Sequence, residues 1–389
     1  MSANRASLRI GFTPLADCAT LAVAQEMGFF AEHKLEVRLE PQSSWATSRD
    51  LLRVGALDAA HMLAPAPVAA ALGGDRSIIA PMALSLNGNS IVVSRALFEA
   101  MEQADPNAGA SCLAAAKALG AAARQRSGKP LRLAAVFAES NHNLDLRRWL
   151  RAGGMRPDDD VRIAIVPPGE VERCLERGLI DAFCVGEPYG SLALWRGAGR
   201  IVASSWDLWS NRIEKVLAAN SGLAQDRPEA LRALLRALIC AAQWADKPEN
   251  RPSVANLLVE AGYIPAPLEV VRAGLMGQVK YGRELQPRSN PDFLVLHRYA
   301  ANFPWLSQAR WLAGALADAG LAPRAEPNQP LGFRPDLYAE AAADLGIAYP
   351  LIDAKEEGAH STAWTLREAT QPMAMGPEIR FETIASEIT

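Results

Sequence analysis

The feature that most constrains this chain is an internal repeat at an offset of about 123 residues. Residues 8–10 (LRI) match residues 131–133 (LRL), and the longer stretch 52–59 (LRVGALDA) matches 175–182 (LERGLIDA). Single residues between and after these stretches match at the same offset, among them Leu21 with Leu144 and Pro65 with Pro188. Self-similarity at a constant spacing indicates that two similar structural units follow one another in the chain.

Within each copy of the repeat, short apolar segments typical of strands alternate with helical segments. The first copy predicts strands at 8–13, 36–40 and 59–63 and helices at 19–30 and 48–54; the second predicts strands at 131–137, 161–166 and 182–185 and helices at 144–152 and 171–177. This alternation predicts an α/β protein of two lobes, each a doubly wound, mostly parallel sheet. Gly55 and Gly178 stand where a helix must end before the next strand, a position that favours glycine because it accepts positive φ.

The two lobes are expected to share the chain discontinuously. We predict that residues 1–93 and about 218–350 form the first lobe, because the strong helical pattern at 227–244 follows a second crossing of the chain. Residues 94–217 are then the second lobe. The stretch from about 351 to 389 shows no periodicity and is predicted to be a surface tail.

Composition excludes several classes of protein. The 389 residues carry 40 basic and 43 acidic side chains, so a net charge of −3 gives no reason to expect direct nucleic-acid binding. The five cysteines are widely spaced, which argues against a disulfide framework or a zinc site. No secretory segment precedes the first predicted strand, and no apolar run of about 20 residues occurs. We therefore predict a cytoplasmic protein with no membrane association.

The predicted topology indicates where a ligand binds. Ligands of open parallel sheets lie outside the carboxyl ends of the strands, so two facing lobes form a ligand cleft between them. The loops at these ends are 13–17, 42–45, 61–65, 139–143, 167–170 and 186–189. The first two of each lobe lead into helix N-termini, which favour a small anion. No spacing of side chains predicts a metal or a cofactor.

Five segments, taken together and in order, resemble the nitrate- and bicarbonate-binding proteins of ABC importers. They are 11–17 (GFTPLAD), 44–50 (SWATSRD), 60–65 (AHMLAP), 149–154 (WLRAGG) and 181–188 (DAFCVGEP). The resemblance implies the two-lobed, periplasmic-binding-protein-like fold of type II and a function in binding, not catalysis.

Importer members of the family are exported and lipid-anchored, and no leader is seen here. The chain is therefore most similar to the family's cytoplasmic nitrate/nitrite sensors of the NasS type. Those sensors restrain an RNA-binding antiterminator of the NasT type until the anion binds, and lobe closure is the expected signal.

The resemblance also implies a set of ligand-binding residues: Trp45, Asn89, His142, Pro168, Gly169 and Lys215. Trp45 would cover the planar anion and donate its indole N–H, and His142 would donate a hydrogen bond. Lys215 would supply one positive charge, which suits a monovalent anion. Asn89 replaces the glutamine expected in importers and would donate an amide N–H, while Pro168 and Gly169 would bring backbone to the pocket edge.

Each of these residues also has an ordinary structural interpretation. The alternative for Trp45 is a core tryptophan, for His142 a helix N-terminal residue with local partners, and for Lys215 a solvated surface lysine. Asn89 follows Asn87-Gly88, which is typical of a turn, and residues 168–169 are typical of a loop before a helix.

Three alternative functions stay open. The chain is similar enough to importer proteins to be the substrate-binding component of a nitrate or bicarbonate importer whose leader is missing. Enzymes are also known on this fold, including a desulfinase whose cysteine follows the first strand, as Cys18 does here with His61 in a later strand. A pyrimidine-synthase-like function is less favoured, because no clustered cysteines are present to hold iron.

Overall fold

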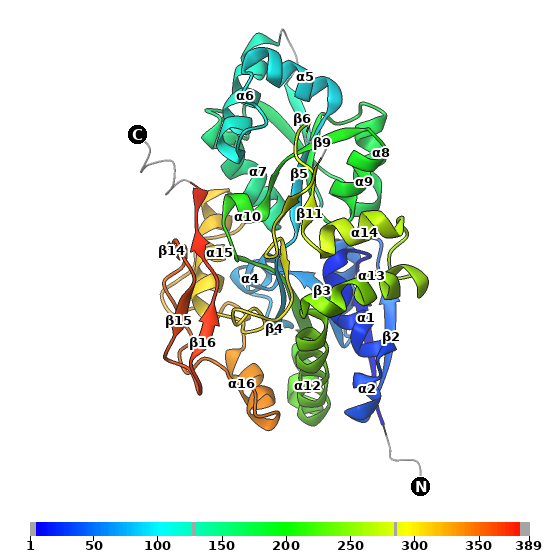
Figure 1. Cartoon of the computed structure of the whole chain (residues 1–389). Coiled ribbons are helices and arrows are strands. Elements are labelled where there is room, and N and C mark those ends of the chain that lie inside the picture. The colour runs from blue at the N-terminus through cyan, green and yellow to red at the C-terminus, as the bar shows by residue number, and fades with distance from the viewer. Residues whose placement is uncertain (1–4, 127–129, 284–285, 382–389) are drawn as a thin grey trace. The chain divides into compact units, whose positions relative to one another are not determined.

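The computed structural model describes residues 5–126, 130–283 and 286–381, and within it the chain divides into two compact units. Unit 1 comprises Met1–Leu86, Ile213–Pro265 and Val295–Glu378. Unit 2 comprises Asn87–Arg212, Ala266–Leu294 and Ile379–Thr389. Each unit has its own sheet and its own covering helices (Figure 1).

The described residues of unit 1 form a mixed sheet with the strand order β13-β4-β10-β3-β1-β2. Its strands are β1 (Ala6–Phe12), β2 (Leu35–Pro41), β3 (Ala59–Leu63), β4 (Ile78–Asn87), β10 (Ile213–Asn220) and β13 (Leu294–Val295). The helices of this unit are η1 (Ala16–Cys18), α1 (Ala19–Glu26), α2 (Phe29–Glu32), α3 (Trp45–Arg53), α4 (Pro65–Leu72), α11 (Ser221–Asp226), α12 (Pro228–Ala245), η3 (Pro248–Asn250), α13 (Arg251–Glu260), α15 (Leu306–Asp318) and α16 (Pro335–Asp344). The helix α12 packs against α1 and α16, and α15 packs against α4.

Unit 2 contains a sheet with the order β7-β6-β8-β5-β9. Its strands are β5 (Asn89–Ser94), β6 (Leu131–Ala135), β7 (Val161–Ile165), β8 (Ala182–Gly186) and β9 (Gly199–Ser204), with β11 (Gln278–Val279) and β12 (Arg288–Ser289) forming a separate antiparallel pair. The helices are α5 (Arg95–Ala104), α6 (Cys112–Gln125), α7 (Asn141–Ala152), η2 (Pro168–Glu170), α8 (Val171–Glu176), α9 (Tyr189–Trp195), α10 (Ser205–Leu208) and α14 (Leu268–Leu275). Apolar side chains of α5, α6 and α7 bury one face of this sheet, with Trp149 fully enclosed.

The two sheets repeat each other in register. In unit 1, β1 pairs with β3 in parallel with Ile10 opposite Ala59. In unit 2, β6 pairs with β8 in parallel with Leu133 opposite Ala182. Both pairs are separated by the offset of the sequence repeat, which the structure therefore confirms as a repeat of tertiary structure.

The same hydrogen bond, from a backbone N–H of the first strand to an aspartate carboxylate, occurs in both repeats. The backbone N–H of Arg9 donates to the carboxylate of Asp58 at 2.7 Å, and that of Arg132 donates to Asp181 at 2.8 Å. The turn before each aspartate contains the predicted glycine in the left-handed region, Gly55 with φ 72° and Gly178 with φ 65°. The LRVGALDA and LERGLIDA stretches thus end a helix and start a strand in the same way.

Each sheet contains one strand that runs against its neighbours. In unit 1, β10 is antiparallel to both β3 and β4, and in unit 2, β5 is antiparallel to both β8 and β9. These are the strands by which the chain enters each sheet after leaving the other unit. The prediction of mostly parallel sheets thus holds for the repeated β-α-β parts, and the crossing strands make both sheets mixed.

The division of the chain differs from the expected one in several places. The first crossing lies at residue 87 instead of 94, so Asn89 belongs to unit 2, and the second lies at residue 213 instead of 218, so Lys215 belongs to unit 1. Residues 266–294, expected in the first lobe, belong to unit 2 through α14 and the β11–β12 pair. Residues 351–378, expected as a tail, belong to unit 1 and contain β15 (Trp364–Leu366) paired with β16 (Met373–Met375). Two shorter strands, β14 (Ala359–His360) and β17 (Glu378–Ile379), pair with each other. Strands of two or three residues are too short to produce the periodicity by which sequence patterns are recognised.

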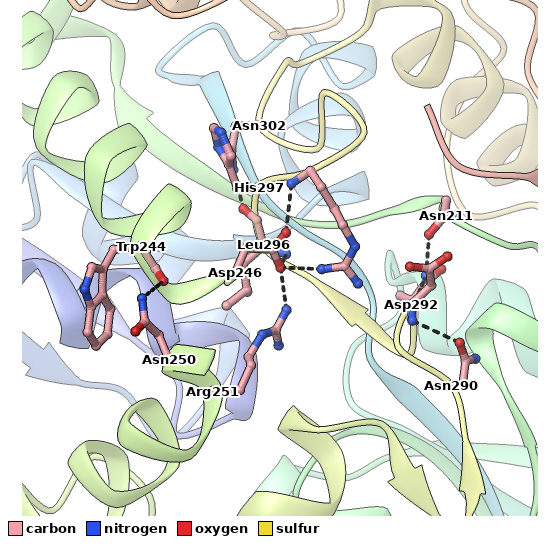
Figure 2. A network of polar contacts seen from close by, with 12 residues as sticks. Asn211, Trp244, Asp246, Asn250, Arg251, Asn290, Asp292, Leu296, His297 and Asn302 are labelled. Atoms are coloured by element: carbon pink, nitrogen blue, oxygen red, sulfur yellow. Dashed lines mark hydrogen bonds and ion pairs between the residues drawn. The ribbon is translucent and has the colours of Figure 1, made fainter. Parts of the chain in front are cut away.

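A buried carboxylate fastens the last part of unit 1 to α12. Asp246 follows that helix and accepts the backbone N–H groups of Leu296 and Arg298, both at 2.9 Å (Figure 2). Burial tends to raise the pKa of Asp246, but the guanidinium groups of Arg251 and Arg298 overcome this and lower it. Asn302 continues the network by donating to backbone carbonyls of β4 and of Leu296.

In the part of the chain that the structure describes, no helix combines the length and the apolar character that a bilayer span requires.

Candidate functional site

Unit 1 contains a buried group of polar and aromatic side chains that we call the Lys215 cluster: Asp17, Trp45, His61, Glu214 and Lys215. Each of them is at most 2% exposed. They come from four elements: η1 after β1, the first turn of α3, β3 and β10. Such complete burial of four ionisable side chains is unusual, because ionised groups are rarely buried unless they are paired.

Shifts in strand register determine how β10 presents the cluster. The register of β10 against β4 shifts between Ile213 and Lys215 and again between Lys215 and Val216. In a regular strand, neighbouring side chains point to opposite faces. Here Glu214 and Lys215 are both buried and Lys215 Nζ lies 2.9 Å from Glu214 Oε1.

Lys215 is held between two carboxylates. Its Nζ lies 2.8 Å from Asp17 Oδ2, and the other Asp17 oxygen lies 3.1 Å from His61 Nε2. Burial tends to raise the pKa of Asp17, but Lys215 and His61 overcome this and hold the pKa below its usual range. Burial likewise tends to lower the pKa of Lys215, and Asp17 and Glu214 raise it instead. Lys215 is therefore a charged, buried lysine, which excludes the interpretation of a solvated surface residue.

Trp45 covers this cluster. It is the first residue of α3, which starts there because the side chain of Ser44 caps the backbone N–H of Thr47 at 3.1 Å. The indole lies 5.5 Å from the His61 ring in an edge-to-face arrangement, and Lys215 Nζ lies 5.8 Å from the indole centroid. Within the described residues, the buried Nε1 of Trp45 has no hydrogen-bond acceptor. A core tryptophan normally satisfies this N–H, so the orphaned donor is consistent with a ligand contact.

In unit 2, Asn89 occupies a position comparable to that of Lys215. It is the first residue of the antiparallel strand β5 and pairs with Gly186, the last residue of β8. Lys215 likewise lies early in β10, opposite Leu63, the last residue of β3. In both units, the crossing strand thus places its candidate residue at the carboxyl end of a parallel strand.

Asn89 is fully buried, and its backbone N–H donates to Ser205 Oγ at 3.1 Å. Its side-chain amide has no hydrogen-bond partner among the residues described. The turn expected here is formed by Asn87 and Gly88, with φ of 59° and 90°, and not by Asn89 itself. Asn89 is therefore a buried strand residue with an unused amide donor.

The other three predicted residues lie at the starts of helices. His142 is the second residue of α7 and is fully buried, and Ser140 begins that helix by capping the N–H of Asn143 at 3.1 Å. Pro168 is buried and Gly169 exposed in η2, just before α8. The structure brings Trp45 and Lys215 together in unit 1 and places Asn89, His142, Pro168 and Gly169 at strand ends or helix starts of unit 2.

Sequence reasoning missed four buried ionisable residues. Asp17 lies in the predicted ligand loop 13–17 without a predicted role, and His61 was predicted only as a partner for Cys18. Glu214 gave no signal, because an acid next to a lysine in sequence is expected on the opposite face of a strand. Glu187, also in a predicted ligand loop, accepts Ser90 Oγ at 2.7 Å and the N–H of Ser191 at 3.0 Å. Burial raises its pKa and these two donors only partly oppose the shift.

Cys18 does not have the environment of a nucleophile. It is 1% exposed, and burial together with the charge of Asp17 raises the pKa of its thiol. Reactive cysteines need the opposite, a lowered pKa and access to solvent. Within the residues that the structure describes, no group of three or more His, Cys, Asp or Glu side chains could hold a metal ion.

Comparison with known proteins agrees with this architecture. The chain is similar to the crystal structure of the periplasmic nitrate-binding protein NrtA from Synechocystis PCC 6803, with a TM-score of 0.80, 26% identity and coverage of 88% of this chain and 89% of that one. The alkanesulfonate-binding protein SsuA from Xanthomonas axonopodis pv. citri has the same fold at 16% identity, with a TM-score of 0.60 and coverage of 87% and 98%. The fold is thus that of the periplasmic binding proteins.

Sequence comparison gives the family. The model of the NMT1-like family matches residues 2–259, and this chain belongs to that family. It is 32% identical over 356 residues to the nitrate import ATP-binding protein NrtC of Synechocystis, covering 88% of this chain and 51% of that protein. It is 28% identical over 350 residues to the nitrate/nitrite binding protein NrtA of Nostoc, covering 87% and 77%. The chain spans about half the length of the NrtC-type relatives that it matches.

Proposed function

We propose that this protein binds nitrate or nitrite. The observation that carries the proposal is the buried indole Nε1 of Trp45, which has no acceptor among the described residues and lies in the same cluster as the ammonium of Lys215. In unit 2, the side-chain amide of Asn89 is a second buried donor of this kind. A small planar oxyanion accepts hydrogen bonds at every oxygen, so it satisfies donors that the protein leaves unused. Relatives named as nitrate or nitrite binding proteins support this choice of ligand.

The charges of the Lys215 cluster argue against a divalent anion. Its one ammonium already faces the carboxylates of Asp17 and Glu214, so the cluster has no surplus positive charge. A dianion such as sulfate would bring a second charge that nothing here neutralises, and burying an uncompensated charge is costly. We propose that nitrate or nitrite interacts with the ammonium of Lys215 and the indole N–H of Trp45 in unit 1. His142, Pro168 and Gly169 of unit 2 stay candidate ligand-binding residues.

A thermal-shift titration with nitrate, nitrite, bicarbonate, sulfate and chloride at constant ionic strength tests the proposal. A ligand at about 100 times its dissociation constant adds roughly 2.7 kcal/mol of stability, which is readily detected. We expect a saturable shift with nitrate or nitrite and none with sulfate. A shift with bicarbonate alone would assign a different anion, and no shift with any anion would refute the proposal.

A finer proposal concerns the biological role. We propose that the protein is a cytoplasmic sensor whose ligand releases a NasT-like RNA-binding antiterminator; the support is the family resemblance of the sequence. Co-purification with a purified NasT-type protein tests this. Association without nitrate and release by nitrate are expected. No association in either state would contradict the sensor role.

The alternative role is that of a substrate-binding component of a nitrate or bicarbonate importer. Relatives named for nitrate import and bicarbonate transport favour it. Fractionation of the native host separates the two roles, because a sensor is recovered with the cytoplasm and an importer component with the cell envelope. The burial and raised pKa of Cys18 give no support to a desulfinase-like enzyme.

A further inference from the structure

Unit 2 contains a pocket that none of the proposed anion contacts lines. It encloses about 650 Å³ and lies where the end of α9, the helix α14, the start of β9 and residues 278–283 meet. A volume of this size is typical of sites for small organic molecules, and far exceeds what nitrate needs. The side chains that give the pocket its character are Trp195, Arg200, Glu269, Val270, Lys280 and Arg283.

The walls of this pocket are held by contacts within unit 2. The N–H of Gly282 donates to the carbonyl of Ile201 at 2.8 Å, which fixes residues 280–283 beside β9. On the other side, α14 packs against α9 and approaches the buried Glu187 so closely at Gly274 that a Cβ there would lie 2.8 Å from the Glu187 Cβ. Tyr281, between the lining residues Lys280 and Gly282, is itself buried. The pocket is therefore part of the folded unit.

The cations of the pocket are only partly neutralised. Arg283 is paired with Glu102 at 2.7 Å. The half-buried Arg200 donates to the carbonyl of Gly199 at 3.0 Å, and neither it nor Lys280 has an ion pair with a described carboxylate. Burial lowers the pKa of Arg200, and the like charges of Arg95 and Arg283 lower it further. A group of cations crowded in this way favours a bound anion.

Beside these cations stands a large exposed aromatic surface. Trp195 is the last residue of α9 and is 55% exposed, although most tryptophans of folded proteins are largely buried. The half-buried Leu194 and Ala273 add apolar surface to the same pocket. An exposed indole beside arginine and lysine is the combination that binds the ring and the phosphate of a nucleotide, by stacking and by charge-assisted hydrogen bonds respectively.

We propose that this pocket binds a nucleotide-like ligand, with its phosphate groups on Arg200 and Lys280 and its aromatic ring against Trp195. Glu269 accepts a hydroxyl or amino hydrogen of the ligand, a role that an acid in a basic pocket can perform. This site is separate from the residues proposed for nitrate. A second ligand on unit 2 would give the protein a second input beside the anion.

ADP is the probe for the first test, by isothermal titration of the full chain at 50 mM and 200 mM salt. We expect saturable binding that weakens at the higher salt, no binding of adenosine, and at most weak binding of pyrophosphate. The three probes separate the phosphate contribution from that of the ring. Adenosine binding as tightly as ADP, or no ADP binding at 1 mM, would overturn the proposal.

Variants then locate the site. Arg200→Gln with Lys280→Gln should weaken ADP binding at least tenfold, and Trp195→Leu should weaken it severalfold and remove the fluorescence change of that residue. The control is Lys117→Gln with Arg177→Gln, two exposed cations of unit 2 outside the pocket, which should bind ADP as the wild type does. Nitrate-induced thermal shifts should persist in all three variants and show that they are folded. Unchanged ADP affinity in both pocket variants would overturn the assignment.

Discussion

Lys215 Nζ lies 2.8 Å from Asp17 Oδ2, and both side chains are almost completely enclosed by unit 1. The pair joins a crossing strand to the loop after β1, two segments about 200 residues apart in sequence. A lysine expected to offer a free positive charge to an anion is thus also a structural counter-ion. Its removal should affect folding as well as binding.

We predict that Lys215→Met destabilises the protein by about 3–5 kcal/mol, because two buried carboxylates lose their cation. Urea unfolding of this variant and the wild type measures the difference. The exposed Lys117→Met in unit 2 is the control and should change stability by less than about 0.5 kcal/mol. Adding Asp17→Asn to Lys215→Met should recover part of the loss. If Lys215→Met unfolds at the wild-type urea concentration, the buried ion pair contributes nothing.

Trp45→Phe removes the unpaired indole N–H together with part of the buried ring. We expect nitrate affinity to fall about tenfold, which corresponds to the loss of one hydrogen bond to a charged group, and stability to fall because the smaller ring leaves a cavity. Calorimetric titration measures the affinity. The matched variant is Trp149→Phe, whose Nε1 donates to the carbonyl of Cys112 at 3.0 Å. Both variants should lose stability, and only Trp45→Phe should lose nitrate affinity. Equal nitrate affinity of Trp45→Phe and Trp149→Phe would remove Trp45 from the site.

The C-terminal part of unit 1 should make stability depend on pH. Glu378 and Glu357 share the buried Lys355, and burial together with the charge of Glu357 raises the pKa of Glu378 to about 8. Between its ordinary value of 4.5 and about 8, the folded protein holds a proton that the unfolded chain has released. The free energy of unfolding should therefore fall as pH rises through this window, by up to about 1.4 kcal/mol per pH unit.

Denaturant unfolding at several pH values between 6 and 8 measures this dependence. In Glu378→Gln, which has no proton to release, the fall in the free energy of unfolding with pH should be less steep by up to about 1.4 kcal/mol per pH unit. Equal slopes in the two proteins would show that Glu378 is not the group that holds it.

Two glycines in helices should respond oppositely to alanine. A Cβ at Gly120 in α6 would lie 2.0 Å from the carbonyl oxygen of Gly153, so Gly120→Ala must push α6 away from α7. We expect Gly120→Ala to lower the free energy of unfolding by about 1–3 kcal/mol. Gly314 in α15 has nothing within 4 Å of that position, so Gly314→Ala should stabilise by about 0.5–1 kcal/mol. Thermal unfolding compares the two, and an equal effect of both would refute the close helix contact.

Local sequence patterns predicted much of the fold. The strand β3 at 59–63 and the helices α8 and α12 lie within one or two residues of their expected positions. These elements bury apolar residues at regular spacing, and caps and glycines mark their ends. The sequence repeat that contains Asp58 and Asp181 also predicted two sheets of similar structure, and these two aspartates form equivalent hydrogen bonds in the two units.

Two features follow only from the tertiary structure: which residues meet in the Lys215 cluster, and where the chain crosses from one unit to the other. Glu214 and Lys215 share one buried cluster because register shifts in β10 turn them there, and such a shift depends on the neighbouring strand, not on the residues it contains. Strands as short as β11 and β16 carry no periodicity of their own and are recognised only by their pairing with β12 and β15. Residue periodicity is a local property, so it predicted the longer helices and strands from the sequence. The ion pair of Asp17 and Lys215 joins residues far apart in the sequence. It forms only in the folded protein, where both side chains are removed from water and each needs an opposite charge.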